Sequence, residues 1–163
     1  MREALNEALK AGEENEVPIG CVVVIDGHVI SRGHNQTEKL NDATAHAEMI
    51  ALTSAANYLG NWRLQNATVY VTIEPCIMCA SAMVLSRVKR IVFGARDPKF
   101  GGCGSIFDIA NDKRLNHRIT VAEGVLKEEA VEMMKNFFKK KRKKAGARSK
   151  ASDCHVPPRG RDS

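Results

Sequence analysis

Two short motifs constrain the fold of this chain more than any other feature: His46-Ala47-Glu48 and Pro75-Cys76-Ile77-Met78-Cys79. Each motif opens a segment with helical apolar periodicity, and the 26 residues between them (49–74) have room for the rest of a helix, a loop and a strand. Cys76 and Cys79 are three residues apart, so both can face one point from the first turn of a helix. The fold must bring two helix starts together if these side chains form one group.

The side chains of these motifs are typical metal ligands. His46, Cys76 and Cys79 offer one imidazole and two thiolates, which suit Zn²⁺. Structural zinc sites close all four positions with protein, whereas catalytic sites leave one position for water. No fourth ligand is obvious, so we expect one catalytic zinc ion per chain, with Glu48 beside it to transfer protons. The order H-x-E…P-C-x-x-C is the signature of zinc-dependent nucleobase deaminases.

Length and composition favour one domain with a real core. The chain has 163 residues, of which 44% are hydrophobic and 27% charged. No apolar run approaches the roughly 18 residues of a membrane span, and the N-terminus is too charged for a secretory signal. Five cysteines, two of them at metal spacing, do not indicate a disulfide framework. We therefore expect a reducing, cytoplasmic location and no membrane partner.

Positive charge is concentrated at the C-terminal end. The net charge is +6, from 25 basic and 19 acidic residues. Residues 135–163 hold 11 basic and 2 acidic residues, which leaves 14 basic and 17 acidic residues in 1–134. The unbroken basic run 139–144 suits binding to a phosphate backbone through counterion release. A solvated tail or a localisation signal has the same composition.

The chain alternates between helical and strand patterns. We expect helices over 2–10, 45–58, 76–86 and 126–144, and strands over 19–25, 28–33, 68–73, 90–94 and 118–123. Asp26-Gly27 predicts a hairpin turn, and Asp42 or Thr44 can cap the second helix. The segment 96–104 has the composition of a Gly-rich loop. The helix over 76–86 lies between the strands over 68–73 and 90–94, so we expect these strands to be parallel and joined by a crossover. Beyond Ala145 the composition predicts disorder.

Several further stretches carry a family resemblance. The chain resembles the bacterial tRNA adenosine deaminase family, within the cytidine deaminase-like superfamily, from about residue 1 to 144. The zinc motifs are typical of the whole superfamily. The matching stretches from residue 86 onward and the basic C-terminal end favour the tRNA branch. The matching stretches are 16–20, 33–35, 44–48, 70–80, 86–87, 93–97, 115–118, 123–126 and 137–138.

This resemblance implies a three-layer α/β/α fold with a five-stranded mixed sheet. It implies a zinc-dependent deaminase domain over 1–144, including the basic helix, and a tail over 145–163. It also implies a homodimer that binds a tRNA anticodon stem-loop and converts the wobble adenosine to inosine. The implied site residues are His46, Cys76 and Cys79 for zinc, Glu48 for proton transfer, and Asn35, Asp97, Lys99, Phe138, Lys139 and Arg142 for the RNA substrate.

Other interpretations of the same residues stay open. A deaminase of a free base or nucleotide, such as guanine, cytosine or deoxycytidylate, would use the same zinc chemistry without the basic helix. A non-catalytic nucleic-acid-binding module with structural zinc would need a fourth ligand, for which Cys103 is the best candidate. A redox pair at Cys76 and Cys79 would leave His46 unexplained. Many bacterial members of the family have a small residue where this chain has Cys103. Asn35 would also suit a simple structural role in a turn.

Overall fold

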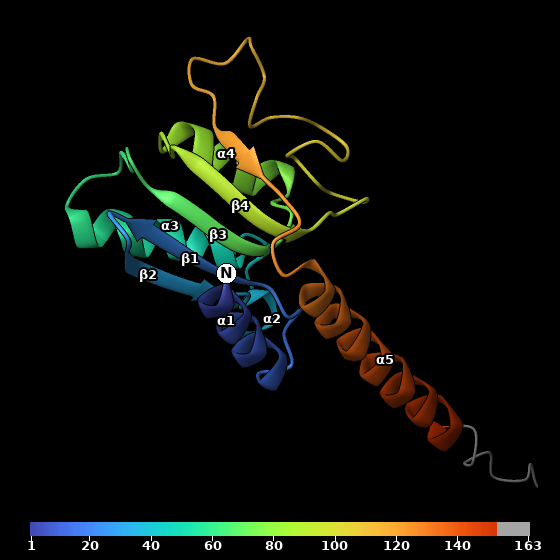
Figure 1. Cartoon of the computed structure of the whole chain (residues 1–163). Coiled ribbons are helices and arrows are strands. Elements are labelled where there is room, and N and C mark those ends of the chain that lie inside the picture. Colours follow the sequence, from blue (N-terminus) through green and yellow to red (C-terminus); the bar gives the residue numbers. More distant parts are fainter. Residues whose placement is uncertain (153–163) are drawn as a thin grey trace, which may run out of the picture.

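A single mixed sheet organises the computed structural model, which describes the backbone of residues 1–152 and the side chains of residues 1–144 (Figure 1). The strands lie in the order β2-β1-β3-β4-β5, with β1 antiparallel to both neighbours and β3, β4 and β5 parallel. The elements in chain order are α1 (Arg2–Glu13), β1 (Gly20–Ile25), β2 (His28–His34), α2 (Thr37–Leu40), α3 (Ala47–Leu59), β3 (Thr68–Ile73), α4 (Ile77–Leu85), β4 (Arg90–Ala95), β5 (Thr120–Ala122) and α5 (Lys127–Ser152).

Helices cover both faces of the sheet. On one face, α3 and α4 pack over a large core that includes Leu52, Val71, Met83 and Phe93. On the other face, α1 and α5 contact each other and the strands, with Ile73, Ala95 and Ala130 forming a smaller core. The predicted three-layer fold with a five-stranded mixed sheet is therefore confirmed. No helix within residues 1–152 is long and apolar enough to cross a membrane.

Gly33 fixes the start of α3 on the sheet. A Cβ atom at this position would collide with the carbonyl oxygen of Ala47, in the first turn of α3. Only glycine allows this close approach of helix and strand backbones. The sequence His46-Ala47-Glu48 is thus held directly against β2, near the edge where the metal motif lies.

The structure places most predicted elements and corrects several details. The Asp26-Gly27 turn is present, with positive φ at both residues (48° and 79°). The short helix α2 was not predicted. The predicted cap of α3 was wrong, because His46 is its N-cap and makes no side-chain cap bond. Asp42 instead accepts hydrogen bonds from the backbone N–H and hydroxyl of Thr44 at 2.7 Å each.

The last helix is longer than predicted. α5 reaches Ser152, beyond the predicted end at Lys144, so part of the tail predicted to be disordered is helical in its backbone. Lys, Arg and Ala have high helix propensity, Gly146 costs only about 1 kcal/mol, and the first proline comes at Pro157. The rest of the predicted tail, 153–163, lies outside the described residues.

Candidate metal centre and substrate pocket

Two helix N-termini carry the candidate metal ligands. His46 is the N-cap of α3 and Cys76 is the N-cap of α4, both with extended backbone. The Nδ1 atom of His46 lies 3.6 Å from the Sγ atom of Cys76 and 3.5 Å from that of Cys79. All three possible ligand atoms lie within 4.8 Å of one another, so the group could hold a metal ion. Free N–H groups at both helix starts also favour thiolates here.

The thiols of this group are strongly coupled. The Cys79 thiol donates a hydrogen bond that lowers the pKa of Cys76 to about 4, although burial acts in the opposite direction. The same hydrogen bond and burial raise the pKa of Cys79. These shifts favour the thiolate form of Cys76 over that of Cys79. Metal binding would release the remaining thiol proton and so supply two thiolate ligands.

Glu48 lies beside this group without belonging to it. Its side chain is only 3% exposed. Burial raises its pKa to about 7, an effect partly opposed by a backbone hydrogen bond and by His46. A carboxyl group with a pKa near neutrality can both accept and donate a proton at physiological pH. The proton-transfer role of Glu48 stays a prediction, which its position and its pKa support.

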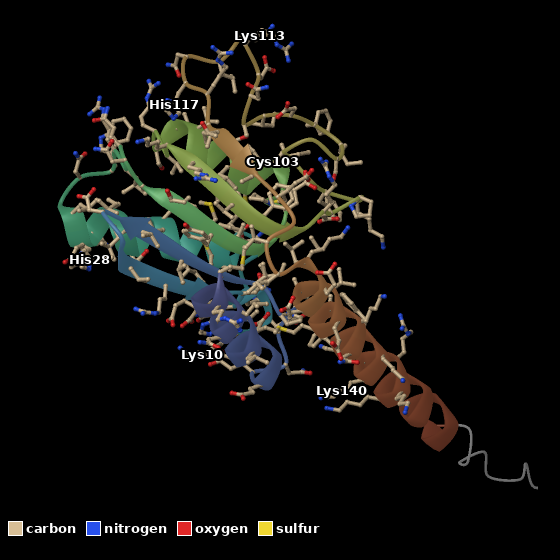
Figure 2. The ribbon with its side chains drawn as sticks, in the orientation of Figure 1. Lys10, His28, Cys103, Lys113, His117 and Lys140 are labelled. Atoms are coloured by element: carbon tan, nitrogen blue, oxygen red, sulfur yellow. The ribbon has the colours of Figure 1, made fainter. Side chains whose placement is uncertain are left out.

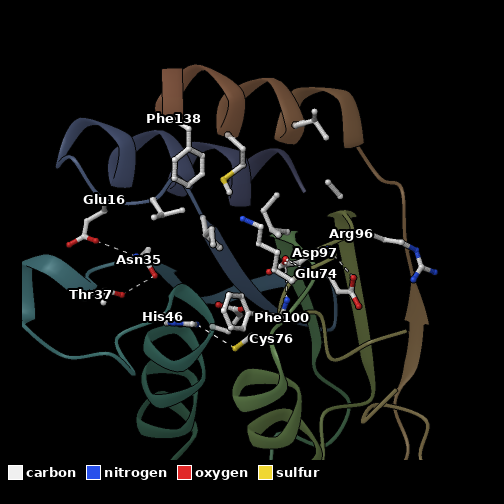
Figure 3. A pocket seen from close by; sticks show the side chains of 18 of the residues that line it. Glu16, Asn35, Thr37, His46, Glu74, Cys76, Arg96, Asp97, Phe100 and Phe138 are labelled. Carbon is white, nitrogen blue, oxygen red and sulfur yellow. Dashed lines mark hydrogen bonds between the residues drawn. The ribbon is translucent and has the colours of Figure 1, made fainter. Parts of the chain in front are cut away.

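A pocket of about 750 Å³ opens above the metal group. Figure 3 shows His46 and Cys76 at one end of this pocket and Phe138 of α5 at the other. The pocket brings together most of the predicted site residues, namely Asn35, His46, Glu48, Cys76, Asp97, Lys99 and Phe138. Cys79 is fully buried behind it. Lys139 and Arg142 do not line it and lie farther along α5.

Asn35 is fixed in the pocket wall by a hydrogen-bond network (Figure 3). Its Nδ2 donates to Glu16 at 3.2 Å, and its Oδ1 accepts from the hydroxyl of Thr37 at 3.4 Å. Glu16 is only 1% exposed and also accepts from the backbone N–H of Lys39 at 2.8 Å. A carboxylate can only accept, so Glu16 fixes which end of the Asn35 amide faces it. One N–H and one lone pair of that amide are left for a ligand.

Glu74 organises the loop that forms another wall. Its carboxylate accepts hydrogen bonds from the backbone N–H groups of Asp97, Cys103 and Ser105, at 3.0 Å each, and from the Ser105 hydroxyl. Burial raises the pKa of Glu74, but these hydrogen bonds outweigh it and lower the pKa. The loop is also bonded to the metal motif, because Gly102 N–H donates to the Pro75 carbonyl at 2.8 Å. Neither this role of Glu74 nor that of Glu16 was predicted from the sequence.

The remaining predicted residues occupy distinct positions. Asp97 accepts from the backbone N–H groups of Lys99 and Phe100, at 2.9 and 3.3 Å, and so shapes the loop at the pocket mouth. The ring of Phe138 packs edge-to-face on Phe137 at 5.3 Å and stays 42% exposed. Cys103 is buried, which raises its pKa to about 12, and it is not in the metal group found among the described residues.

Comparisons with known proteins match this chain to deaminases. The family model described as MafB19-like deaminase matches residues 1–142. The tRNA-specific adenosine deaminase of Bacillus subtilis is 51% identical over 150 residues, which cover 92% of this chain and 93% of that protein.

Two solved structures share the fold. One comes from studies of A-to-I editing by tRNA:A34 deaminases at the wobble position of transfer RNA. It has a TM-score of 0.79 and 45% identity, and the match covers 82% of this chain and 96% of that one. The guanine deaminase of Bacillus subtilis is more distant, with a TM-score of 0.56 and 34% identity over 58% of this chain and 61% of that one. The match to the structure from the tRNA:A34 deaminase studies is higher in TM-score, identity and coverage than the match to the guanine deaminase.

Proposed function

Because the chain belongs to the tRNA-specific adenosine deaminase family, we propose that it hydrolyses the wobble adenosine of a tRNA anticodon loop to inosine and ammonia. The observation that carries this proposal is the convergence of His46, Cys76, Cys79 and Glu48 at the base of one pocket whose rim reaches α5. The pocket is large enough for a purine nucleotide, and the helix beyond its rim is strongly basic.

Zinc is the metal that we propose for the ligand group. Tetrahedral zinc, with bonds of about 2.3 Å to sulfur and 2.0–2.1 Å to nitrogen, separates a sulfur and a nitrogen ligand by about 3.6 Å. The separations of 3.6 and 3.5 Å between His46 Nδ1 and the two Sγ atoms fit this geometry. When bound, zinc would acidify a water molecule and so supply the hydrolytic nucleophile.

Glu48 handles the protons of the reaction. Its carboxylate accepts a proton from the attacking water and delivers it to N1 of the purine ring as C6 is attacked. The carboxylate next takes the proton of the new C6 hydroxyl and passes it to the amine, so that the C6–N bond breaks, ammonia leaves and C6 becomes the carbonyl of inosine. Its pKa of about 7 suits both directions of transfer.

Asn35 and the pocket rim hold the substrate. The free N–H and lone pair of the Asn35 amide bind the edge of the base, in the orientation that Glu16 fixes. The target base must leave its stack, which costs a few kcal/mol in a duplex and less in a loop. An anticodon loop is therefore a favourable substrate. Phe138, Lys139, Arg142, Asp97 and Lys99 are proposed RNA contacts around it.

Assembly, domain limits and location complete the proposal. Exposed apolar side chains at the end of α4 and in the loop between β4 and β5, including Leu85, Phe100 and Phe107, support a homodimer. We assign the catalytic domain to residues 1–144. A cytoplasmic location follows from a tRNA substrate.

Inosine formation on defined substrates tests this function. Stem-loops with adenosine or cytidine at the wobble position would be compared with free adenosine, guanine, cytidine and deoxycytidylate, and kcat/KM would be measured for each. We expect the adenosine stem-loop to be the best substrate by a wide margin. A higher kcat/KM for a free base or nucleotide would contradict the tRNA assignment and favour a free-substrate deaminase, such as a guanine deaminase.

A further inference from the structure

A second basic surface lies where three loops meet at the edge of the sheet. These loops are 60–67, 86–89 and 111–118, and they lead into the adjacent parallel strands β3, β4 and β5. The register pairs Thr68 with Arg90 and Arg90 with Thr120, so the loops enter the sheet side by side. We call the surface formed by these loops and by Arg90, the first residue of β4, the loop face. Its basic residues are Arg63, Arg87, Lys89, Arg90, Lys113, Arg114 and Arg118.

Backbone and side-chain bonds hold the three loops together as one surface. The N–H of Leu64 donates to the Ser86 carbonyl at 2.7 Å, which joins the first loop to the second. The ring of His117 is 2.7 Å from the Val88 carbonyl, and Arg87 Nη1 donates to the Asn116 carbonyl at 3.0 Å. The backbones that carry the charges of the loop face are therefore held in fixed relative positions.

The loop face is far more positive than the domain around it. It holds seven basic residues and one acidic residue, Asp112, a balance of +6. The other residues of 1–134 hold 7 basic and 16 acidic side chains, a balance of −9. Asp112 is paired with Arg114 at 2.6 Å, and within the described residues no other ion pair involves the loop face. Such unpaired positive charge is complementary to a polyanion.

An exposed aromatic residue adds to this surface. Trp62 is 55% exposed, and the guanidinium of Arg63 lies 4.1 Å from the centre of its ring. An exposed aromatic ring among basic side chains is typical of surfaces that bind nucleic acid. The combination favours RNA over a small anion, which would need a concave site.

The loop face is too far from the pocket to serve the same nucleotides. The pocket is lined by Ile73 and Ala95, at the C-terminal ends of β3 and β4, whereas Arg90 begins β4. Six strand residues span about 17 Å, which is several times the rise of about 3.4 Å per nucleotide in a duplex strand. Figure 2 shows Lys113 and His117 at the end of the molecule away from Lys140 of α5.

We propose that the loop face binds the sugar–phosphate backbone of the RNA substrate outside the anticodon stem-loop. This inference rests on the proposed tRNA substrate and extends it to a second contact region. Phosphate contacts of this kind position a nucleic acid without reading its sequence. The loop face would thereby favour full-length tRNA over a minimal stem-loop.

Neutralising the loop face tests this proposal. The variant Lys89→Gln, Arg90→Gln, Arg118→Gln removes three exposed charges. A matched control, Arg2→Gln, Arg32→Gln, Lys127→Gln, removes three charges elsewhere on the surface. Filter binding over a range of salt concentrations, and turnover, would be measured for full-length tRNA and for the stem-loop.

We expect the loop-face variant to bind full-length tRNA about 10- to 100-fold more weakly. The slope of log K against log salt should be lower by roughly 0.9 for each phosphate that the variant no longer neutralises. Its turnover of the stem-loop should match that of the unmodified protein, which also shows that it is folded.

Three results would overturn the proposal. The loop-face variant could lose affinity equally for both RNAs, it could keep its affinity for full-length tRNA, or the control variant could lose as much affinity for tRNA as the loop-face variant does. If the unmodified protein deaminates neither RNA, the proposed function fails, and tRNA binding by the two variants still tests the loop face.

Discussion

The metal centre and the basic surfaces of this protein are built in opposite ways. The candidate metal centre uses half-buried and buried side chains at two helix starts, packed against a sheet. The basic run on α5 and the loop face use exposed, largely unpaired charges. Buried groups have perturbed pKa values and fixed geometry, which suit chemistry, whereas exposed charges supply affinity that depends on salt. Changes in the two regions should therefore act on turnover and on binding separately.

Removal of a metal ligand should have the largest effect. Cys76→Ala leaves only two ligands, so zinc content should fall to near zero and the rate should drop by at least about 10⁶-fold, towards the uncatalysed reaction. RNA binding by the basic surfaces should change little. Metal analysis and inosine formation, measured beside filter binding, check this separation. Substantial turnover without bound metal would show that the metal group is not catalytic.

Glu48→Gln should retain zinc but lose the proton transfer. General acid–base catalysis typically contributes about 10² to 10⁴ in rate, so kcat should fall by that factor while KM for the stem-loop stays similar. Glu38→Gln is the matched control, because Glu38 also lines the pocket but is exposed. Near-normal turnover in zinc-loaded Glu48→Gln protein would remove the proton-transfer role.

The network around Asn35 should have an intermediate effect. Asn35→Ala removes the base contact and one donor to buried Glu16, which together correspond to about 10- to 100-fold in kcat/KM. Glu16→Gln allows the Asn35 amide to flip, so we expect a smaller loss. The double variant should lose little more than Asn35→Ala alone, since Glu16 acts through Asn35. Fully additive losses in this double-mutant cycle, with zinc content unchanged, would mean that Glu16 does not position Asn35.

The basic run of α5 should have the smallest effect on turnover. Neutralising Lys139, Lys140, Lys141 and Arg142 should raise KM for the stem-loop about tenfold at physiological salt and leave kcat unchanged. The slope of log K against log salt should decrease by roughly 0.7 to 0.9 for each phosphate that is no longer neutralised. An unchanged slope would assign the run to a solvated surface instead.

Local patterns were enough to predict much of this molecule. The strand over 68–73 matches β3, and the two helix starts bring His46 and Cys76 together as the motif spacing requires. Short-range periodicity encodes these features. The longer α5 and the short α2 were missed because composition and propensity fix helix ends poorly.

Long-range features could not be read from the sequence. Glu16 and Glu74 are buried carboxylates that accept hydrogen bonds from backbone N–H and side-chain groups about 20 to 30 residues away, and only the folded chain brings them together. Glu74 follows a buried strand directly, which is the one local sign of its role. The loop face was not predicted because its charges are divided among three loops, whereas the basic run of α5 is continuous.

X-ray absorption at the zinc edge tests the central claim most directly, because it counts the ligand types of the bound metal. The account predicts one zinc ion per chain with two sulfur ligands at about 2.3 Å, one imidazole nitrogen at about 2.0 Å and one further light ligand from water. Cys103→Ser should leave this spectrum unchanged. Three sulfur ligands, reduced to two by Cys103→Ser, would show a closed structural site and contradict a catalytic role for the metal.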